Sequence, residues 1–181
     1  MRSAFIEPMS PMERRWRQAL PLALLVYGLW CLATWDRWHL PDFINLPIHE
    51  TGHLVFAWGG EVITALGGTL FQLIVPLMFV IYFWRRGDRY SASVPLWWMG
   101  QNCLNIARYV ADARAMELPL VGGGEHDWNY LLSVWGALPR DTQIAHDIRF
   151  VGAIVAATAV WIGWRYTETT VDGRRSTVEV A

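Results

Sequence analysis

The chain has 181 residues, of which 54% are hydrophobic and 17% are charged, and its mean hydropathy is +0.21. Soluble globular domains carry about 25% charged residues, so this composition argues against a water-soluble enzyme and against a disordered protein. All 15 basic residues are Arg, and the 16 acidic residues leave a net charge of −1, which gives nucleic acid no basic surface to bind. The two Cys residues lie in apolar runs without CxxC spacing, so we expect neither a disulfide framework nor a Cys-based zinc site.

Four apolar segments are candidates for membrane-spanning helices, each of which needs about 20 residues. They cover residues 16–35, 62–84, 91–112 and 148–164. The third carries polar residues in its interior, and the fourth is short. We therefore predict an all-α membrane protein with about four transmembrane helices. A bacterial inner (plasma) membrane is the expected location, with no nucleic-acid partner.

The region between the first two apolar segments is too polar to be an ordinary span. Pro47 suits the first turn of a helix, and Gly59-Gly60 is a natural stop, so a short helix is expected over residues 48–58. This helix either crosses the membrane or re-enters it. If it re-enters, three groups of Arg residues all fall on the cytoplasmic side, as the positive-inside rule requires. These groups are Arg14, Arg15 and Arg17; Arg85, Arg86 and Arg89; and Arg165, Arg174 and Arg175.

We favour the re-entrant arrangement. It implies a cytoplasmic N-terminal tail over residues 1–15, one membrane-embedded helical domain over residues 16–165, and a polar C-terminal tail over residues 166–181.

The short helix carries the sequence His49-Glu50-Thr51-Gly52-His53, an HExxH motif. Residues four apart lie on one face of a helix, so both imidazoles can bind a single Zn²⁺ while Glu50 stands beside the attacking water as general base. The alternative is a local hydrogen-bonded cluster at the membrane surface. Three ionisable groups on one apolar turn are costly near a membrane, which favours the functional interpretation.

This motif resembles that of the site-2 protease family, the intramembrane zinc metalloproteases. In that family the third zinc ligand is an Asp in an Asn-x-x-Pro-x-x-x-Leu-Asp-Gly stretch on a later span. The third apolar segment here has Asn105 and Asp112 at nearly that separation, without the Pro and the Leu-Asp-Gly. The resemblance implies a helical membrane peptidase that binds zinc.

A catalytic zinc usually has three protein ligands and one open position. The leading candidates for the third ligand are Asp112 and His126, and His39 and His146 are weaker ones. Asp112 has an alternative role as the i+4 ion-pair partner of Arg108, and His126 has one as an ordinary loop residue. Asp127 is a candidate to orient a liganding His from the second shell.

A polar stripe also runs along one face of the third apolar segment at helical spacing. It consists of Gln101, Asn105, Arg108 and Asp112. The stripe either forms a wall of the active-site cavity or provides hydrogen bonds between helices, and the sequence does not decide between these roles. In the first role, Asn102 or Asn105 would bond to an extended substrate backbone.

These observations predict a membrane-embedded zinc metallopeptidase. Its partners would be the lipid bilayer and a membrane-protein or peptide substrate. The alternative from another class is a non-enzymatic metal-binding scaffold or transporter component that uses only the His pair.

Overall fold

The computed structural model describes residues 9–120 and 125–168, and these residues form helices and no strands. The long helices are α1 (Pro11–Ala33), α3 (Gly60–Arg85), α4 (Arg89–Ala111) and α6 (Asp141–Arg165). The shorter elements are α2 (Asp42–Phe56), η1 (Ala57–Gly59), α5 (Asp127–Val134) and η3 (Leu138–Arg140). The prediction of an all-α protein is confirmed. Most of both predicted tails lies outside the described residues.

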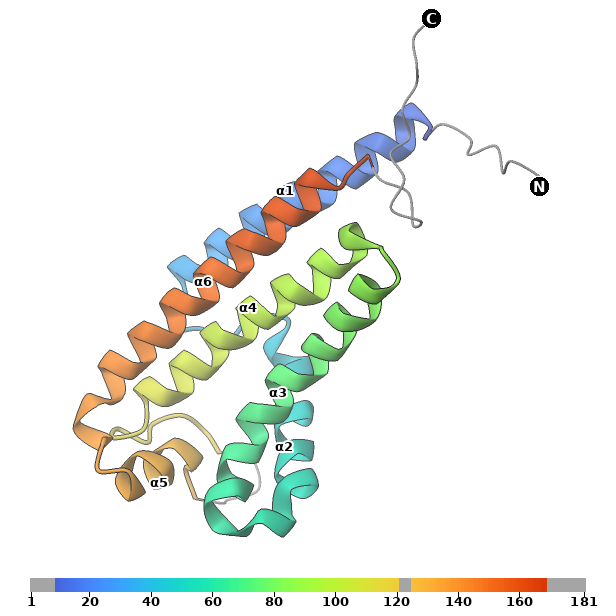
Figure 1. Cartoon of the computed structure of the whole chain (residues 1–181). Coiled ribbons are helices and arrows are strands. Elements are labelled where there is room, and N and C mark those ends of the chain that lie inside the picture. Colours follow the sequence, from blue (N-terminus) through green and yellow to red (C-terminus); the bar gives the residue numbers. More distant parts are fainter. Residues whose placement is uncertain (1–8, 121–124, 169–181) are drawn as a thin grey trace, which may run out of the picture.

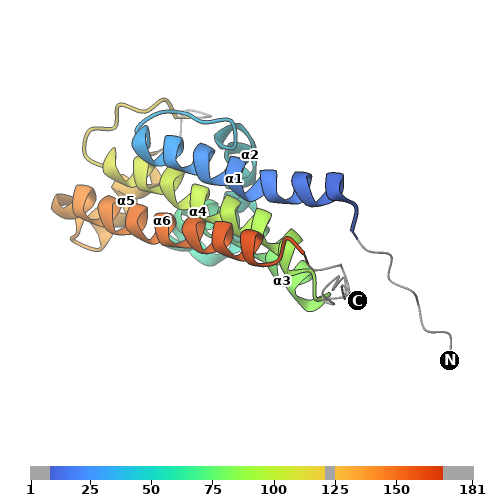
Figure 2. The same ribbon diagram turned by 90° about the horizontal axis from the view of Figure 1, so that it is seen from above.

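α4 is the central helix, and α1, α3 and α6 pack around it (Figures 1 and 2). Of its 23 residues, 12 are buried. It approaches α6 closely at Gly100, where an added Cβ would lie 2.8 Å from the carbonyl oxygen of Gly152. Such small residues let two helix backbones come together. Trp97 of α4 packs against Gly28 of α1.

Within the described residues, three stretches are long and apolar enough to cross a membrane: α1, the stretch Asp42–Arg85 that contains α2 and α3, and the stretch Leu138–Arg165 that contains α6. Their outward faces expose large apolar side chains, including Leu29 of α1, Met78 of α3 and Phe150 of α6. The predicted count of four spans is not confirmed. α4 has a spanning length but a more polar composition, because residues such as Gln101 and Asn102 face neighbouring helices rather than the outside.

α2 is too short to cross a membrane by itself, since its 15 residues rise about 22 Å against about 30 Å of hydrocarbon. It begins beside the middle of α4, where the Gln101 side chain donates a hydrogen bond to Asp42 (2.6 Å) and accepts one from Asn45 (3.0 Å). These buried bonds support an extra turn before Pro47. The expectation of a helix that starts after Pro47 was therefore wrong, and Pro47 lies inside α2.

α2 is held against α3 by three glycines. A Cβ on Gly52 would collide with the carbonyl oxygen of Gly67, and a Cβ on Gly68 would lie 2.6 Å from the His49 ring. Gly52 belongs to the HExxH motif, so the residue that permits this contact is placed between the two motif histidines.

The start of α1, the α3–α4 turn and the end of α6 lie at one end of the bundle, and α5 and the end of α2 lie toward the other (Figures 1 and 2). Contact between α1 and α4 at the first end is direct, because the Arg17 guanidinium lies 4.2 Å from the centre of the Tyr90 ring. The described Arg groups thus share one end of the molecule. Arg174 and Arg175 lie outside the described residues.

Candidate metal centre

His49 and His53 project from one face of α2, as their four-residue spacing predicts. Their rings meet edge to face, with centroids 4.8 Å apart and planes at 82°. His49 is 9% exposed, so its imidazole is removed from bulk water.

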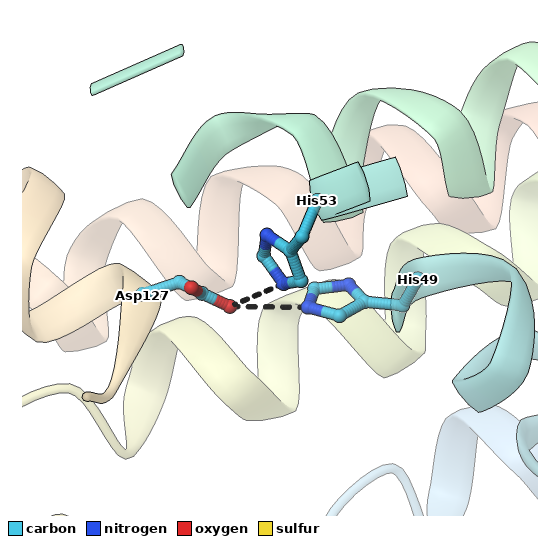
Figure 3. A group of neighbouring side chains, drawn as sticks. All are labelled: His49, His53 and Asp127. Atoms are coloured by element: carbon cyan, nitrogen blue, oxygen red, sulfur yellow. Dashed lines mark hydrogen bonds and ion pairs between the residues drawn. The ribbon is translucent and has the colours of Figure 1, made fainter. Parts of the chain in front are cut away.

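The third member of the cluster is Asp127, the first residue of α5 (Figure 3). Its Oδ2 atom lies 3.1 Å from His49 Nε2 and 3.3 Å from His53 Nε2. One potential ligand atom from each residue lies within 4.8 Å of the others, and within the described chain no further group of three or more such residues meets this condition. Asp127 is 78 residues from His49, so only the tertiary fold joins them.

The other ring nitrogens of both histidines are held by neighbours. His53 Nδ1 donates to the carbonyl oxygen of Thr64 (2.8 Å), and His49 Nδ1 donates to Gln72 Oε1 (3.2 Å). Gln72 is itself fixed, because its Nε2 donates to Asn105 at 2.7 Å. These bonds hold each ring through Nδ1 and leave Nε2 of each histidine facing Asp127, which is the usual orientation of a metal-binding His.

The Asp127 carboxyl is ionised at neutral pH. Burial raises its pKa, but hydrogen bonds with His49 and His53 lower it by more and bring it to about 2. The Tyr109 hydroxyl accepts a hydrogen bond from the Asp127 amide (3.2 Å) and lies 3.4 Å from Oδ2. A negatively charged oxygen therefore lies beside the Nε2 atoms of both histidines.

This donor set fits Zn²⁺. Ligand atoms about 2.0–2.2 Å from a tetrahedral zinc are roughly 3.3–3.5 Å apart, close to the separations from Asp127 to the two histidines. Two His and one carboxylate form a known catalytic ligand set that leaves a fourth position open.

Asp112 and His126, the two expected candidates for the third ligand, bind each other instead. His126 Nε2 donates to Asp112 Oδ2 at 3.2 Å, while its Nδ1 accepts the Asn129 amide and so caps the start of α5. Asp112 also accepts the amides of Glu117 and Leu118, both at 3.0 Å. Burial lowers the pKa of His126 although Asp112 opposes this, which is consistent with a neutral ring whose two nitrogens are both engaged. The pair holds the loop that positions Asp127.

The weaker candidates are also placed elsewhere. His39 Nε2 lies 2.9 Å from the Thr34 hydroxyl, and the His146 ring packs near that of Trp35. The i+4 ion pair between Arg108 and Asp112 does not form, because Asp112 is used by His126 and the loop amides.

Glu50 lines a cleft of about 1020 Å³ that also contains the His49–His53–Asp127 cluster. No hydrogen bond or ion pair joins Glu50 to the described residues. Its carboxylate is therefore not engaged by any described residue of the cleft.

Different residues of the polar stripe on α4 fill its two predicted roles, cavity wall and contact between helices. Asn105 and Arg108 line the cleft, whereas Gln101 is buried in the hydrogen bonds that attach α2 to α4. One helix face thus supplies both a cavity wall and a contact between helices.

From the sequence, Asp127 was expected only as a supporting residue, and no role was expected for Gln72, Thr64 or Tyr109. One feature of the sequence does indicate that a helix begins at this point. His126 and Asp127 directly precede an apolar segment, and both side chains suit a helix N-terminus. No such signal connects α5 with α2 across 78 residues.

No protein-family model matches the chain, and no significant match was found among curated proteins or solved structures. The function of the protein therefore has to be inferred from the geometry of the site itself.

Proposed function

We propose that the protein is a membrane-embedded zinc metallopeptidase whose metal is held by His49, His53 and Asp127. The observation that carries this proposal is the convergence of Asp127 on the HExxH pair, with Glu50 unpaired in the same cleft. The motif alone gives two ligands and a base, and Asp127 completes the set that a hydrolytic site needs. The proposal keeps the resemblance to site-2 proteases, with the third ligand on α5.

Zn²⁺ at this site would supply a Lewis acid that acidifies water and polarises a peptide carbonyl. Glu50 takes the proton from the attacking water and passes it to the leaving amine. Gln72 and Thr64 keep the two histidines in the tautomer that presents Nε2, and Tyr109 restrains the Asp127 carboxylate.

We place the site near the outer face of a bacterial inner membrane. Exposed apolar side chains on α1, α3 and α6 support contact with lipid, and the end that carries the Arg groups faces the cytoplasm under the positive-inside rule. The cleft then gives the substrate and water a route to the cluster.

The deciding test is Glu50→Gln. Because Glu50 is not a ligand, detergent-purified E50Q protein should contain about one zinc per chain and lose about a hundredfold or more in peptide cleavage. The matched control is Glu125→Gln, which changes another Glu that lines the cleft but is outside the motif. Zinc is measured by elemental analysis and cleavage with unfolded and membrane-embedded peptides. Unchanged cleavage in E50Q, or none in the wild type, would favour the metal-binding scaffold.

A further inference from the structure

Arg108 places a positive charge in the cleft without a direct anionic partner. It lies on α4 one residue before Tyr109, is half-buried, and lines the cleft. Its guanidinium carbon is 5.5 Å from the centre of the Trp38 ring. Within the described chain it forms neither a hydrogen bond nor an ion pair.

The acids whose charges reach Arg108 are Asp36, Asp42 and Asp112, and none of them is close enough to pair with it. Asp42 is occupied, because its Oδ1 accepts Gln101 at 2.6 Å and its Oδ2 accepts the His39 amide at 2.8 Å. Asp112 is occupied by His126 and two loop amides, as described above. Asp36 is exposed.

The remaining charged side chains of the cleft wall are mostly acidic. Five acids line the cleft, and Arg108 is the one Arg among the described lining residues. The five acids are Asp42, Glu50, Glu61, Glu125 and Asp127. Apart from the proposed metal ion, Arg108 is therefore the group in the described cleft wall that is best suited to bind an anionic part of the substrate.

We propose that Arg108 binds a carboxylate of the peptide substrate, either an acidic side chain or a free C-terminus. A guanidinium accepts a carboxylate through two parallel hydrogen bonds, and a half-buried site that is partly shielded from water strengthens them. This inference rests on the proposed peptidase function. It sets the direction of the substrate, with the carboxylate toward Trp38 and the remaining chain across the metal centre.

The test uses three peptides of one length and otherwise one sequence. The first has a free C-terminus and no acidic residue, the second is amidated with one Glu, and the third is amidated and neutral. Their binding is measured on full-length E50Q protein, which prevents turnover, and their cleavage is measured on protein with Glu50 intact. At least one carboxylate peptide should bind about tenfold or more tightly than the neutral one. The preferred peptide identifies the source of the carboxylate.

Arg108→Gln should remove this preference, and Arg108→Lys should restore part of it. Arg149→Gln is the matched control, because Arg149 also stacks on a tryptophan, 4.9 Å from the Trp35 ring, but does not line the cleft. R149Q should keep the preference.

A preference that survives in R108Q, or equal binding of all three peptides, overturns the inference. Loss of thermal stability in R108Q with the preference intact also overturns it, because Arg108 would then only balance Asp42. Failure of the proposed function is read separately, as the absence of zinc or as cleavage that does not depend on Glu50.

Discussion

At the scale of single residues, Asp127 differs from Asp112 and His126 in its hydrogen-bond partners, which decide whether its side chain faces the two motif histidines. Asp112 accepts two loop amides and His126, and both nitrogens of His126 are engaged. The Oδ2 atom of Asp127 faces two imidazole nitrogens across distances that suit a shared metal. A side chain can thus serve as a metal ligand only where the rest of the chain does not already occupy its ligand atoms.

Asp127→Ala tests this assignment. It should weaken zinc binding by more than the 10–100-fold typical of residues that only support ligands, because it removes a donor atom and the negative charge of the site. Zinc affinity is measured by competition with a chromophoric chelator. Asp112→Asn should lower the affinity by about tenfold at most, since it loosens the loop behind Asp127. If D112N loses the metal while D127A retains it, Asp112 is the ligand.

At the scale of elements, the site depends on how closely α2 lies on α3. Gly52, Gly67 and Gly68 let the two backbones meet, so that His49 reaches Gln72 and His53 reaches the Thr64 carbonyl. α5 adds the third side chain, and its first turn is capped by His126. The candidate metal centre is therefore assembled from side chains of separate elements, which are held together by the contacts of α2 with α3 and of α5 with α2.

Gly68→Ala should disturb the site through this contact. The new methyl group would lie 2.6 Å from the His49 ring, and such overpacking costs about 1–3 kcal/mol. We expect a lower unfolding temperature together with at least about tenfold weaker zinc binding, because His49 loses the position set by Gln72.

Gly100→Ala is the matched control for this prediction. Its methyl group would lie 2.7 Å from the backbone of Ala156 on α6, away from the cluster. It should lower stability by a similar amount and leave the zinc affinity of the folded protein unchanged. Equal zinc affinity in G68A and the wild type would show that the glycine contact does not position His49.

At the scale of the whole molecule, α1 and α2 run in the same direction as α4, whereas α3 and α6 run in the opposite one. The evidence is a pair of contacts for each helix. On α4, Tyr90 and Trp97 contact Arg17 and Gly28 of α1 in the same order, and Gln101 and Tyr109 contact Asn45 and His49 of α2 in the same order. The order is reversed for α6, where Gly163 lies by Ser93 and Gly152 by Gly100, and for α3, which joins α4 by a turn and whose Gln72 bonds to Asn105. Because α2 begins beside the middle of α4, it covers only part of the length of the bundle between α1 and α3. The re-entrant arrangement that the Arg groups predict stays a prediction.

Cysteine labelling in intact bacterial cells tests this topology. In a background without Cys31 and Cys103, which are both buried, a membrane-impermeant thiol reagent should label Cys introduced at Glu125 but not at Asp88. The reason is that Asp88 lies in the α3–α4 turn beside three Arg residues. Permeabilised cells, in which both positions should react, provide the control. The reverse pattern would mean that α2 crosses the membrane completely.

Most of the helical framework could be predicted from the sequence because its causes are local. Long apolar runs predict α1, α3 and α6, and the four-residue spacing of His49 and His53 places both on one face of α2 whatever surrounds it. Two boundaries were missed where distant contacts set them. α2 begins at Asp42 through bonds to Gln101, and α6 begins at Asp141, which pairs with Arg114 at 2.7 Å, rather than at residue 148.

The sequence by itself therefore determined the helical class, three of the four predicted apolar spans, and two ligand candidates with an adjacent Glu. Tertiary structure decided which acid faces them. Asp112 and Asp127 are carboxylates on the same side of the motif in the chain, and periodicity cannot rank them. His126 caps α5, and glycines let α2 pack closely on α3, and these two contacts bring Asp127 to the histidines. The carboxylate of Asp112 is instead occupied by hydrogen bonds with His126 and with the amides of Glu117 and Leu118. Side chains 78 residues apart meet only through the summed packing of the helices between them, which no local pattern encodes.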